Sequence, residues 1–481
     1  MKNITEMLRG EENMRKQSSI LKVCLLRILV IGMILGFLGA GTVSVSAATP
    51  KVQRIRWSGM SSKKSMYAKT SKKFKVKITP SRAKKRALKW KSSNKKVATV
   101  SSSGTVKALR PGKATITCYV KSQKYRKVTC RVTVKKKKVT SVKFSSGTPV
   151  VQKGKTYRKS PSVSPSYAYD RRVTYKSSNT KVATVSSSGT VTGKAEGYAT
   201  ITATAKDGSK KKGSYKIRVI GNITNKSSKF VAHRGLSSEA PENTVKAYEL
   251  AGAAGFWGAE ADVRMTKDGK FILMHDATLK RMCGKDVRPE DLTLAEIQKM
   301  PIIAGNNIAK YRNTSTANTV ATLEDYLATC IEYNMVPVIE IKMEYVEYGD
   351  TQNNRSMQRM TTDNMEDLYD ATKKVMGNQQ YMFIAYDFYT MERMNDVLRV
   401  KKLPNVSLQH VTNNPDQGMK NYYKNEKIAL DANYTKITSS EIQAFKNAGI
   451  PVNLWTVDDQ GKVWDYIKMK ADYITTNKRF W

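Results

Sequence analysis

The chain has 481 residues, 40% of them hydrophobic, and a formal net charge of +46. This length predicts roughly three domains, and the lack of a long apolar stretch after residue 50 excludes a protein with several membrane spans. The charge is uneven, because Lys and Arg outnumber Asp and Glu by 46 to 3 in residues 51–221, whereas residues 222–481 contain 33 of each. A polycationic region followed by a neutral one indicates a division of labour between binding and a second activity.

The first 48 residues have the pattern of a secretory signal. Basic residues between Arg15 and Arg27 precede an apolar run at 28–38, and small residues follow near Ala47, where cleavage is expected. The alternative is a membrane anchor, but an apolar run of eleven residues is short for a bilayer core. We expect a secreted or cell-surface protein whose mature chain has no stable transmembrane span.

An internal repeat organises the next region. The segment "WKSSNKKVATVSSSGTV" from Trp90 returns as "YKSSNTKVATVSSSGTV" from Tyr175, an offset of 85 residues. Short Val, Thr, Ile and Tyr alternations broken by Ser, Gly and Asn turns predict two small antiparallel sandwiches, at 50–137 and 138–220. The repeated pattern resembles the bacterial immunoglobulin-like modules of the Big family, which implies an all-β immunoglobulin-like fold for each copy.

Two cysteines lie in neighbouring strand-like runs of the first copy. Cys118 and Cys130 are replaced in the second copy by Ala203 and Tyr215, so both thiols are missing together. A disulfide between Cys118 and Cys130 is plausible in an exported protein, although the sequence does not show its geometry.

The basic modules predict a polyanionic partner. Forty-six basic residues against three acidic ones create a long-range field that attracts polyanions. Anionic envelope polymers such as teichoic acids, bound through residues 50–220, fit an exported protein and indicate a Gram-positive-type envelope. No nucleic acid is expected, because no nucleic-acid motif is present. The alternative is a solvated lysine surface without a partner.

Residues 221–228, "GNITNKSS", are predicted to be a linker, after which the pattern changes. Apolar runs alternate with helical stretches through residues 229–481, which predicts a parallel sheet with helices outside. Nine runs are strand candidates, and "TKDGK" joins the second and third as a hairpin, which makes the third an antiparallel addition. Eight parallel strands remain, the number that closes a TIM barrel. The predicted fold is therefore two all-β sandwiches followed by an α/β TIM barrel.

Charged residues gather at the carboxyl ends of these predicted strands, where TIM barrels place their active sites. His233 ends the first strand and His275 the hairpin strand. Glu260 and Asp262 lie two apart on the second strand and therefore on one side of it. Glu340 and Lys342 repeat that spacing. We expect all of these groups to meet at one rim.

This set of side chains indicates phosphodiester chemistry. Three carboxylates packed together repel unless a cation lies among them, and oxygen ligands favour one divalent ion, Ca²⁺ or Mg²⁺. Arg234 and Lys342 supply charge for a phosphate group. Two imidazoles supply an acid and a base.

The motifs "HRG", "PENT", "EADVRMTKDGKFILMHD" and "IEIK" occur in that order from His233, and they resemble the glycerophosphodiester phosphodiesterase family. The resemblance implies hydrolysis of a glycerophosphodiester to glycerol phosphate and an alcohol. It implies that His233 and His275 are the acid and base. It also implies roles for six further residues: metal binding for Glu260, Asp262 and Glu340, phosphate binding for Arg234 and Lys342, and substrate contact for Trp455.

Two departures from the family pattern concern substrate choice. Asn477 stands where the family usually has aspartate, and residues 384–387, "IAYD", replace a common serine and phenylalanine. Two other functions remain open: a phospholipase C or D-like barrel that acts on intact lipid, and a non-catalytic surface adhesin. The PENT segment, residues 241–244, is expected either to act in the site or to brace the following helix.

Overall fold

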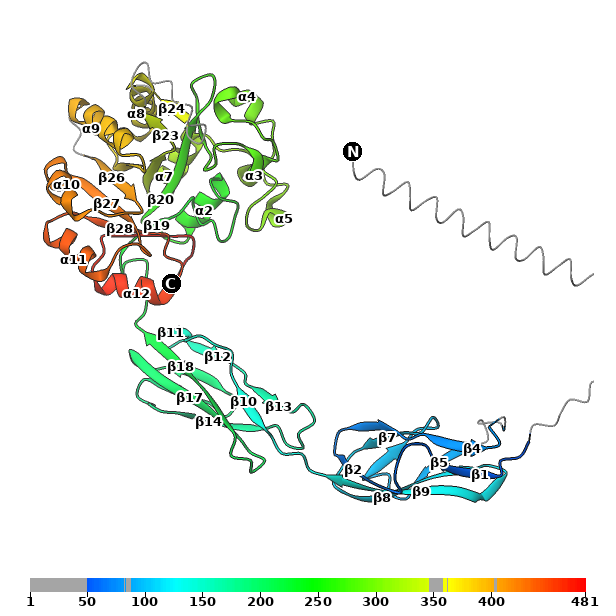
Figure 1. The fold of residues 1–481 in the computed structure, drawn as a ribbon. Helices are drawn as coiled ribbons and strands as arrows, with labels where there is room; N and C mark the ends of the chain where they lie inside the picture. The colour runs from blue at the N-terminus through cyan, green and yellow to red at the C-terminus, as the bar shows by residue number, and fades with distance from the viewer. Residues whose placement is uncertain (1–49, 82, 84–87, 346–357, 361, 402–404) are drawn as a thin grey trace, which may run out of the picture. The chain divides into compact units, whose positions relative to one another are not determined.

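The computed structural model describes residues 50–81, 83, 88–345, 358–360, 362–401 and 405–481. The predicted signal at 1–48 lies outside these residues. The chain divides into two compact units, Met1–Lys137 and Lys138–Trp481, and Figure 1 shows their elements. In the described part of the chain, no helix has both the length and the apolar character needed to cross a membrane.

Module 1, residues 50–137, is a β-sandwich. One sheet has the order β2-β9-β8-β5, a second has β3-β7-β6, and β1 pairs with β4. The strands are β1 (Arg54–Trp57), β2 (Lys63–Tyr67), β3 (Ser71–Lys73), β4 (Val76–Thr79), β5 (Leu88–Ser92), β6 (Ala98–Val100), β7 (Thr105–Ala108), β8 (Gly112–Val120) and β9 (Gln123–Lys135).

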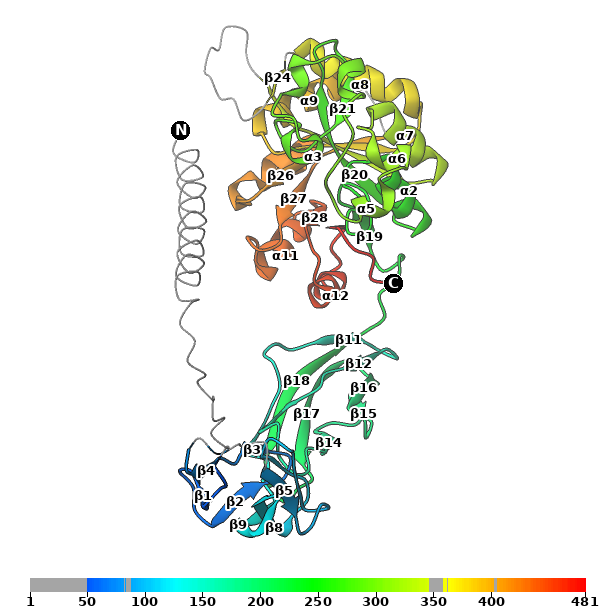
Figure 2. The same ribbon diagram turned by 90° about the vertical axis from the view of Figure 1, so that its right-hand side faces the viewer.

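Module 2, residues 138–220, repeats this arrangement with sheets β11-β18-β17-β14 and β12-β16-β15 and the pair β10–β13. Figure 2 shows the long β17 and β18 side by side. The strands are β10 (Ser141–Lys143), β11 (Val150–Gln152), β12 (Thr156–Arg158), β13 (Ser162–Ser164), β14 (Val173–Ser177), β15 (Ala183–Val185), β16 (Thr190–Gly193), β17 (Gly197–Ala205) and β18 (Lys212–Ile220).

The predicted sandwiches are confirmed, but the sheets are not purely antiparallel. β2 pairs with β9, and β11 with β18, in parallel. Each of these short strands joins the edge of its sheet beside the last strand of its module. Side chains alternate between the two faces of a strand in both parallel and antiparallel pairs, so the sequence pattern did not reveal that these strands pair in parallel.

The predicted disulfide is not formed. Cys118 and Cys130 are buried free thiols, and both point into the core of module 1 from adjacent strands. Their register is offset, because Cys130 stands opposite Ile116 and Cys118 opposite Val128. Diagonal positions on an antiparallel pair lie farther apart than directly opposed ones. Burial raises the pKa of Cys118 to about 12.

The third region is a closed barrel of eight parallel strands, as predicted. Its sheet order is β19-β29-β28-β27-β26-β25-β22-β20, with β19 pairing β20 to close the ring and β21 added antiparallel to β20. These strands are β19 (Lys229–Ala232), β20 (Gly258–Met265), β21 (Phe271–Leu273), β22 (Val336–Ile341), β25 (Tyr381–Ala385), β26 (Val406–Thr412), β27 (Ile428–Asn433), β28 (Val452–Trp455) and β29 (Tyr473–Thr476).

Helices cover the outside of the barrel (Figure 1). Several of them begin at caps that the sequence supplies, such as Thr322 and Thr438, each in a capping box. A further short pair, β23 (Met343–Tyr345) with β24 (Gln358–Met360), follows β22. The helices are α2 (Val245–Ala253), α3 (Lys280–Cys283), α4 (Leu294–Ile297), α5 (Ile308–Tyr311), α6 (Ser315–Asn318), α7 (Leu323–Glu332), α8 (Thr362–Met376), α9 (Phe388–Lys401), α10 (Lys420–Glu426), α11 (Ser439–Asn447) and α12 (Gln460–Lys468).

The predicted linker begins as packed structure. Ile220 and Ile223 are buried in the large hydrophobic cluster between the barrel strands and their helices. Within the same compact unit, Arg218 donates to Asp465 at 3.0 Å. The end of β18 is therefore tied to the barrel, and the start of 221–228 is not a free tether.

Candidate active site

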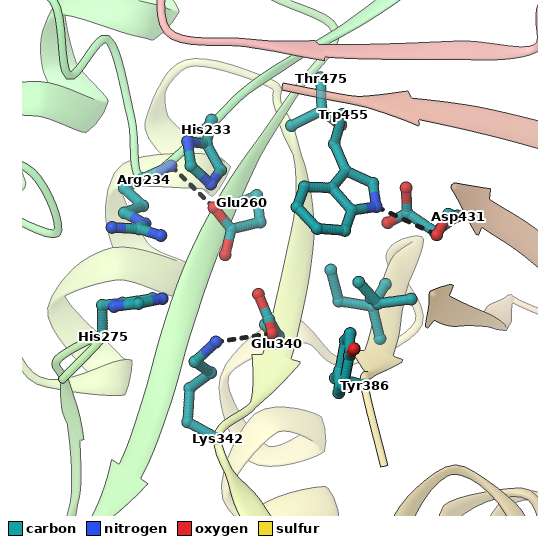
Figure 3. A pocket seen from close by; sticks show the side chains of 12 residues that line it. His233, Arg234, Glu260, His275, Glu340, Lys342, Tyr386, Asp431, Trp455 and Thr475 are labelled. Atoms are coloured by element: carbon teal, nitrogen blue, oxygen red, sulfur yellow. Dashed lines mark hydrogen bonds and ion pairs between the residues drawn. The ribbon is translucent and has the colours of Figure 1, made fainter. Parts of the chain in front are cut away.

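One cavity at the carboxyl ends of the barrel strands collects most of the residues predicted for the site (Figure 3). Period-two alternation along each parallel strand points every second side chain inward, so residues distant in sequence share one rim. The cavity is lined by His233, Arg234, Glu260, His275, Glu340, Lys342, Ile384, Tyr386, Val411, Asp431, Trp455 and Thr475.

The turn after β19 explains the glycine in the "HRG" motif. Arg234 and Gly235 both have left-handed backbone angles, with φ of 57° and 76°. A Cβ atom on Gly235 would lie 2.7 Å from atoms of Ala247 in α2, which only glycine avoids. The tight turn brings the Arg234 amide to Glu260 Oε2, to which it donates at 2.8 Å.

Glu260, Asp262 and Glu340 form a buried carboxylate cluster. One oxygen from each lies within 4.8 Å of the others, because Asp262 stands opposite Glu340 in the parallel register. Burial, and then the charges of Asp262 and Glu340, raise the pKa of Glu260 well above its ordinary value. Neither Glu260 Oε1 nor Asp262 Oδ1 accepts a hydrogen bond, although buried carboxylate oxygens normally do. These oxygens fit a hard divalent cation, which prefers oxygen ligands.

Two cations flank this cluster. Arg234 Nε lies 3.1 Å from Asp262 Oδ2, and Lys342 Nζ lies 2.8 Å from Glu340 Oε1. Burial would raise the pKa of Asp262, but Arg234 and then Lys342 outweigh it and hold the pKa below its ordinary value. Burial would lower the pKa of Lys342, yet Glu340 and Asp262 raise it. Both cations therefore remain charged at the cavity, where they can contact an anionic ligand.

His233 is oriented by a residue from the other end of the barrel domain. Its Nδ1 lies 2.8 Å from Asn477 Oδ1, while Asn477 Nδ2 donates to Asp458 Oδ2 at 2.8 Å. Because a carboxylate only accepts, the amide oxygen must face the ring, and Nδ1 carries the proton. The Nε2 lone pair is then free. Burial, and then the charge of Arg234, lower the pKa of His233 to about 4, so the ring is neutral near pH 7.

His275 has a different partner. Its Nδ1 lies 2.9 Å from Asp276 Oδ1, and Arg281 donates to the other oxygen of Asp276 at 2.7 Å. Burial would raise the pKa of Asp276, but hydrogen bonds from Arg281 and His275 lower it to about 2. The backbone of His275 is also fixed in position, because buried Arg264 donates to its carbonyl at 2.8 Å.

The PENT segment acts in both of the expected ways. Thr244 caps α2 by accepting from the Ala247 amide. Asn243 donates to Asp262 Oδ2 at 2.7 Å, and Glu242 lies 2.8 Å from Arg234 and 2.7 Å from Arg281. The segment therefore braces the helix and also positions two groups of the site.

Ile384, Val411 and Trp455 supply apolar lining to the cavity, and Trp455 lies across it from His275 (Figure 3). The Trp455 ring is fixed because its Nε1 donates to the carbonyl of Asp431 at 3.1 Å. His410, the third histidine, is not in this cavity. Its Nδ1 lies 2.6 Å from Tyr423 Oη in α10, which is a structural contact.

The fold and the site define an α/β barrel enzyme with a buried acidic cluster beside two histidines. Residues 233–478 match the glycerophosphoryl diester phosphodiesterase family, and residues 60–132 and 138–228 match the bacterial Ig-like domain, group 2. The first match covers more than half of the chain. The chain therefore belongs to the glycerophosphoryl diester phosphodiesterase family, and it carries two bacterial Ig-like domains.

Individual relatives share parts of the barrel. Human glycerophosphodiester phosphodiesterase 1 is 36% identical over 112 residues, which is 23% of this chain and only 33% of that protein. A glycerophosphodiester phosphodiesterase of Caldanaerobacter subterraneus is 26% identical over 250 residues, 51% of this chain and 93% of that protein. Among solved structures, a phosphodiesterase of Oleispira antarctica in complex with sn-glycerol-3-phosphate is 20% identical, with a TM-score of 0.42 and coverage of 52% and 92%.

Several residues of the site were not assigned roles from the sequence. Asn477 was noted only as a departure from the family, yet it contacts His233. Asp276 follows His275 directly and could have been considered as its partner. Arg264 and Asp431 gave no usable signal, because an inward-facing strand position has the same spacing whether its side chain serves packing or a site.

Proposed function

We propose that this protein hydrolyses glycerophosphodiesters to glycerol phosphate and an alcohol. The observation that carries the proposal is the convergence of the Glu260, Asp262 and Glu340 oxygens with the two cations and the two histidines in one cavity. The family match supports the same class of reaction. The Trp455 wall gives the non-phosphate part of a substrate an apolar surface to contact.

We infer different catalytic roles for the two histidines from their hydrogen-bond partners. Asn477 holds the proton of His233 on Nδ1, which leaves the Nε2 lone pair to serve as the base that takes a proton from the attacking water. His275, beside Asp276, donates a proton to the leaving oxygen. Arg234 and Lys342 bind the phosphate oxygens and balance their charge.

One divalent cation, Ca²⁺ or Mg²⁺, would be held by Glu260, Asp262 and Glu340, and when bound it supplies positive charge to a phosphoryl oxygen. The oxygens Glu260 Oε1 and Asp262 Oδ1, which accept no hydrogen bond, support this assignment. Arg234 and Lys342 lie beside Asp262 and Glu340, and their charges hold the pKa of Asp262 below its ordinary value, so that this carboxylate is ready as a ligand.

The test uses the full chain with glycerophosphocholine, intact phosphatidylcholine or lipoteichoic acid, each with Ca²⁺, Mg²⁺ or a chelator. We expect metal-dependent release of glycerol phosphate from glycerophosphocholine, loss of that activity in His233→Ala, and normal activity in His410→Ala. Cleavage of intact phosphatidylcholine would favour a phospholipase instead. Failure to release product from any substrate would favour the adhesin.

We also propose that module 1 holds the enzyme on an anionic envelope polymer such as a teichoic acid, after export through the signal at residues 1–48. Residues 50–137 contain no Asp or Glu at all, so their lysines have no carboxylate partner within the module. A solvated lysine surface would normally be interspersed with acids. An unbalanced one creates a field that draws in polyanions.

The strand register concentrates these cations on one face. In the sheet β2-β9-β8-β5, alternate residues point inward, including Cys118 and Cys130, while the residues between them are exposed or half-buried. Lys63 stands opposite Arg131 and Lys89 lies two residues from Lys91, so the backbones of each pair are about 5 to 7 Å apart, a spacing that suits an extended polyphosphate chain. The exposed basic residues of this face are Lys63, Lys89, Lys91, Lys113, Lys127, Arg131 and Lys135.

A further inference from the structure

A buried carboxyl group lies in the cavity away from the acidic cluster. Asp431 is on β27, opposite Val411 of β26 and Asn453 of β28. Its side chain is only 2% exposed, and it lines the cavity next to Trp455 (Figure 3). It does not belong to the group of carboxylates that lie close enough to share an ion among the described residues.

One oxygen of this carboxyl group has no partner. Asp431 Oδ1 makes no hydrogen bond within the described part of the chain. Asn453 is the polar neighbour of this carboxyl group, and its hydrogen bond acts to lower the pKa of Asp431. Asn453 also donates to Gln409 at 3.3 Å and accepts from Thr475 at 3.1 Å. Leaving a buried oxygen unpaired costs stability, so a position of this kind indicates a ligand that completes it.

The surroundings specify the kind of ligand group. Burial, and then the charge of Glu340, raise the pKa of Asp431 well above its ordinary value, which favours the uncharged carboxyl group, a form that can donate as well as accept. Ile384, Val411 and Trp455 beside it are apolar. A neutral acid in an apolar wall matches an alcohol hydroxyl better than it matches a phosphate or an ammonium group.

We propose that Asp431 is a specificity-determining residue that hydrogen-bonds a hydroxyl of the substrate's glycerol moiety. The phosphate is bound on the other side of the cavity by Arg234 and Lys342, so the cavity recognises both the phosphate and the glycerol part of one small molecule. This inference rests on the proposed function for the identity of the polyol. The contact discriminates against ligands without the hydroxyl, because they leave the buried acid unpaired.

The test measures binding and turnover in the full chain with Mg²⁺. Asp431→Leu removes the hydrogen bond at similar size, and Asp431→Asn keeps a group that donates and accepts. We expect Asp431→Leu to weaken sn-glycerol 3-phosphate binding about ten- to hundredfold without changing the affinity for inorganic phosphate, while Asp431→Asn stays within about threefold of the wild type. In turnover, the leucine variant should lose kcat/KM on glycerophosphocholine but not on ethylphosphocholine, which lacks the hydroxyls.

Three results would overturn the inference. One is equal weakening of glycerol phosphate and inorganic phosphate by Asp431→Leu, which would indicate general damage to the site. Another is wild-type affinity for glycerol phosphate in that variant. The third is a loss confined to glycerophosphocholine and absent for glycerophosphoglycerol, which would assign Asp431 to the ammonium head group. Asp431-dependent binding without any turnover would refute the hydrolase function and leave this inference standing.

Discussion

Charge serves opposite physical purposes in the barrel cavity and on module 1. In the cavity, Arg234 and Lys342 are half-buried and lie within 3.1 Å of carboxylate oxygens. On module 1 most of the described lysines are exposed, and residues 50–137 contain no Asp or Glu to balance their charge. Buried charges depend on exact partners, and salt screens them little, whereas exposed charges act through their sum and are screened. One region should therefore be sensitive to single substitutions and the other to ionic strength.

The largest effect should come from the buried cluster. Glu260→Gln removes a charge from the three carboxylates, and we expect kcat/KM on glycerophosphocholine to fall by roughly a thousandfold or more, because this cluster is built to hold the ion. Retention on immobilised teichoic acid should not change. Comparable losses of both properties would show that the two regions are not independent.

A smaller loss should follow from Asn477→Ala, which removes the acceptor that orients His233. We expect kcat to fall about ten- to hundredfold with little change in KM, as for other residues that position a catalytic side chain. Asn433→Ala is the matched control, since Asn433 donates to Asn413 at 2.8 Å and contacts neither histidine. Equal effects of the two substitutions would argue against the orienting role.

The depressed pKa of His233 predicts how stability changes with pH. Folded His233 titrates at about 4, whereas an unfolded histidine titrates near its ordinary value of about 6.5. The unfolded state therefore binds more protons between these values, and this group makes stability fall as pH falls from about 6.5 to 4, by up to about 1.4 kcal/mol per pH unit. Urea unfolding of His233→Asn should show a weaker pH dependence than the wild type. An identical slope would mean that His233 is not held neutral.

The smallest single-site effects should be on module 1. One Lys→Ser substitution should change retention on teichoic acid less than about twofold, because no single lysine dominates a summed field. Log affinity falls as log salt rises, and replacing Lys89, Lys91, Lys113 and Lys127 together should make this negative slope shallower by about 3. The same change at four exposed lysines of module 2, Lys176, Lys206, Lys212 and Lys216, is the control and should have less effect. Salt-independent retention would exclude the electrostatic account.

The sequence was informative where a short-range pattern determines the structure. Alternation and the "TKDGK" hairpin predicted the barrel and its antiparallel β21, and period-two spacing placed Glu260 and Asp262 on one side of β20. Contacts that depend on closure of the fold were not predictable. His233 and Asn477 are 244 residues apart and meet because β19 pairs with β29. The disulfide predicted between Cys118 and Cys130 is absent for a related reason, since strand register decides which residues stand opposite each other.

The central claim is that Glu260, Asp262 and Glu340 hold one divalent cation between the two histidines. Anomalous diffraction from crystals of the full chain soaked with Mn²⁺ tests it directly. The account predicts one peak in the barrel cavity with an oxygen of each of the three residues as a ligand, and its loss in Glu260→Gln. A cavity without a peak, or a peak coordinated by other residues, would contradict the account.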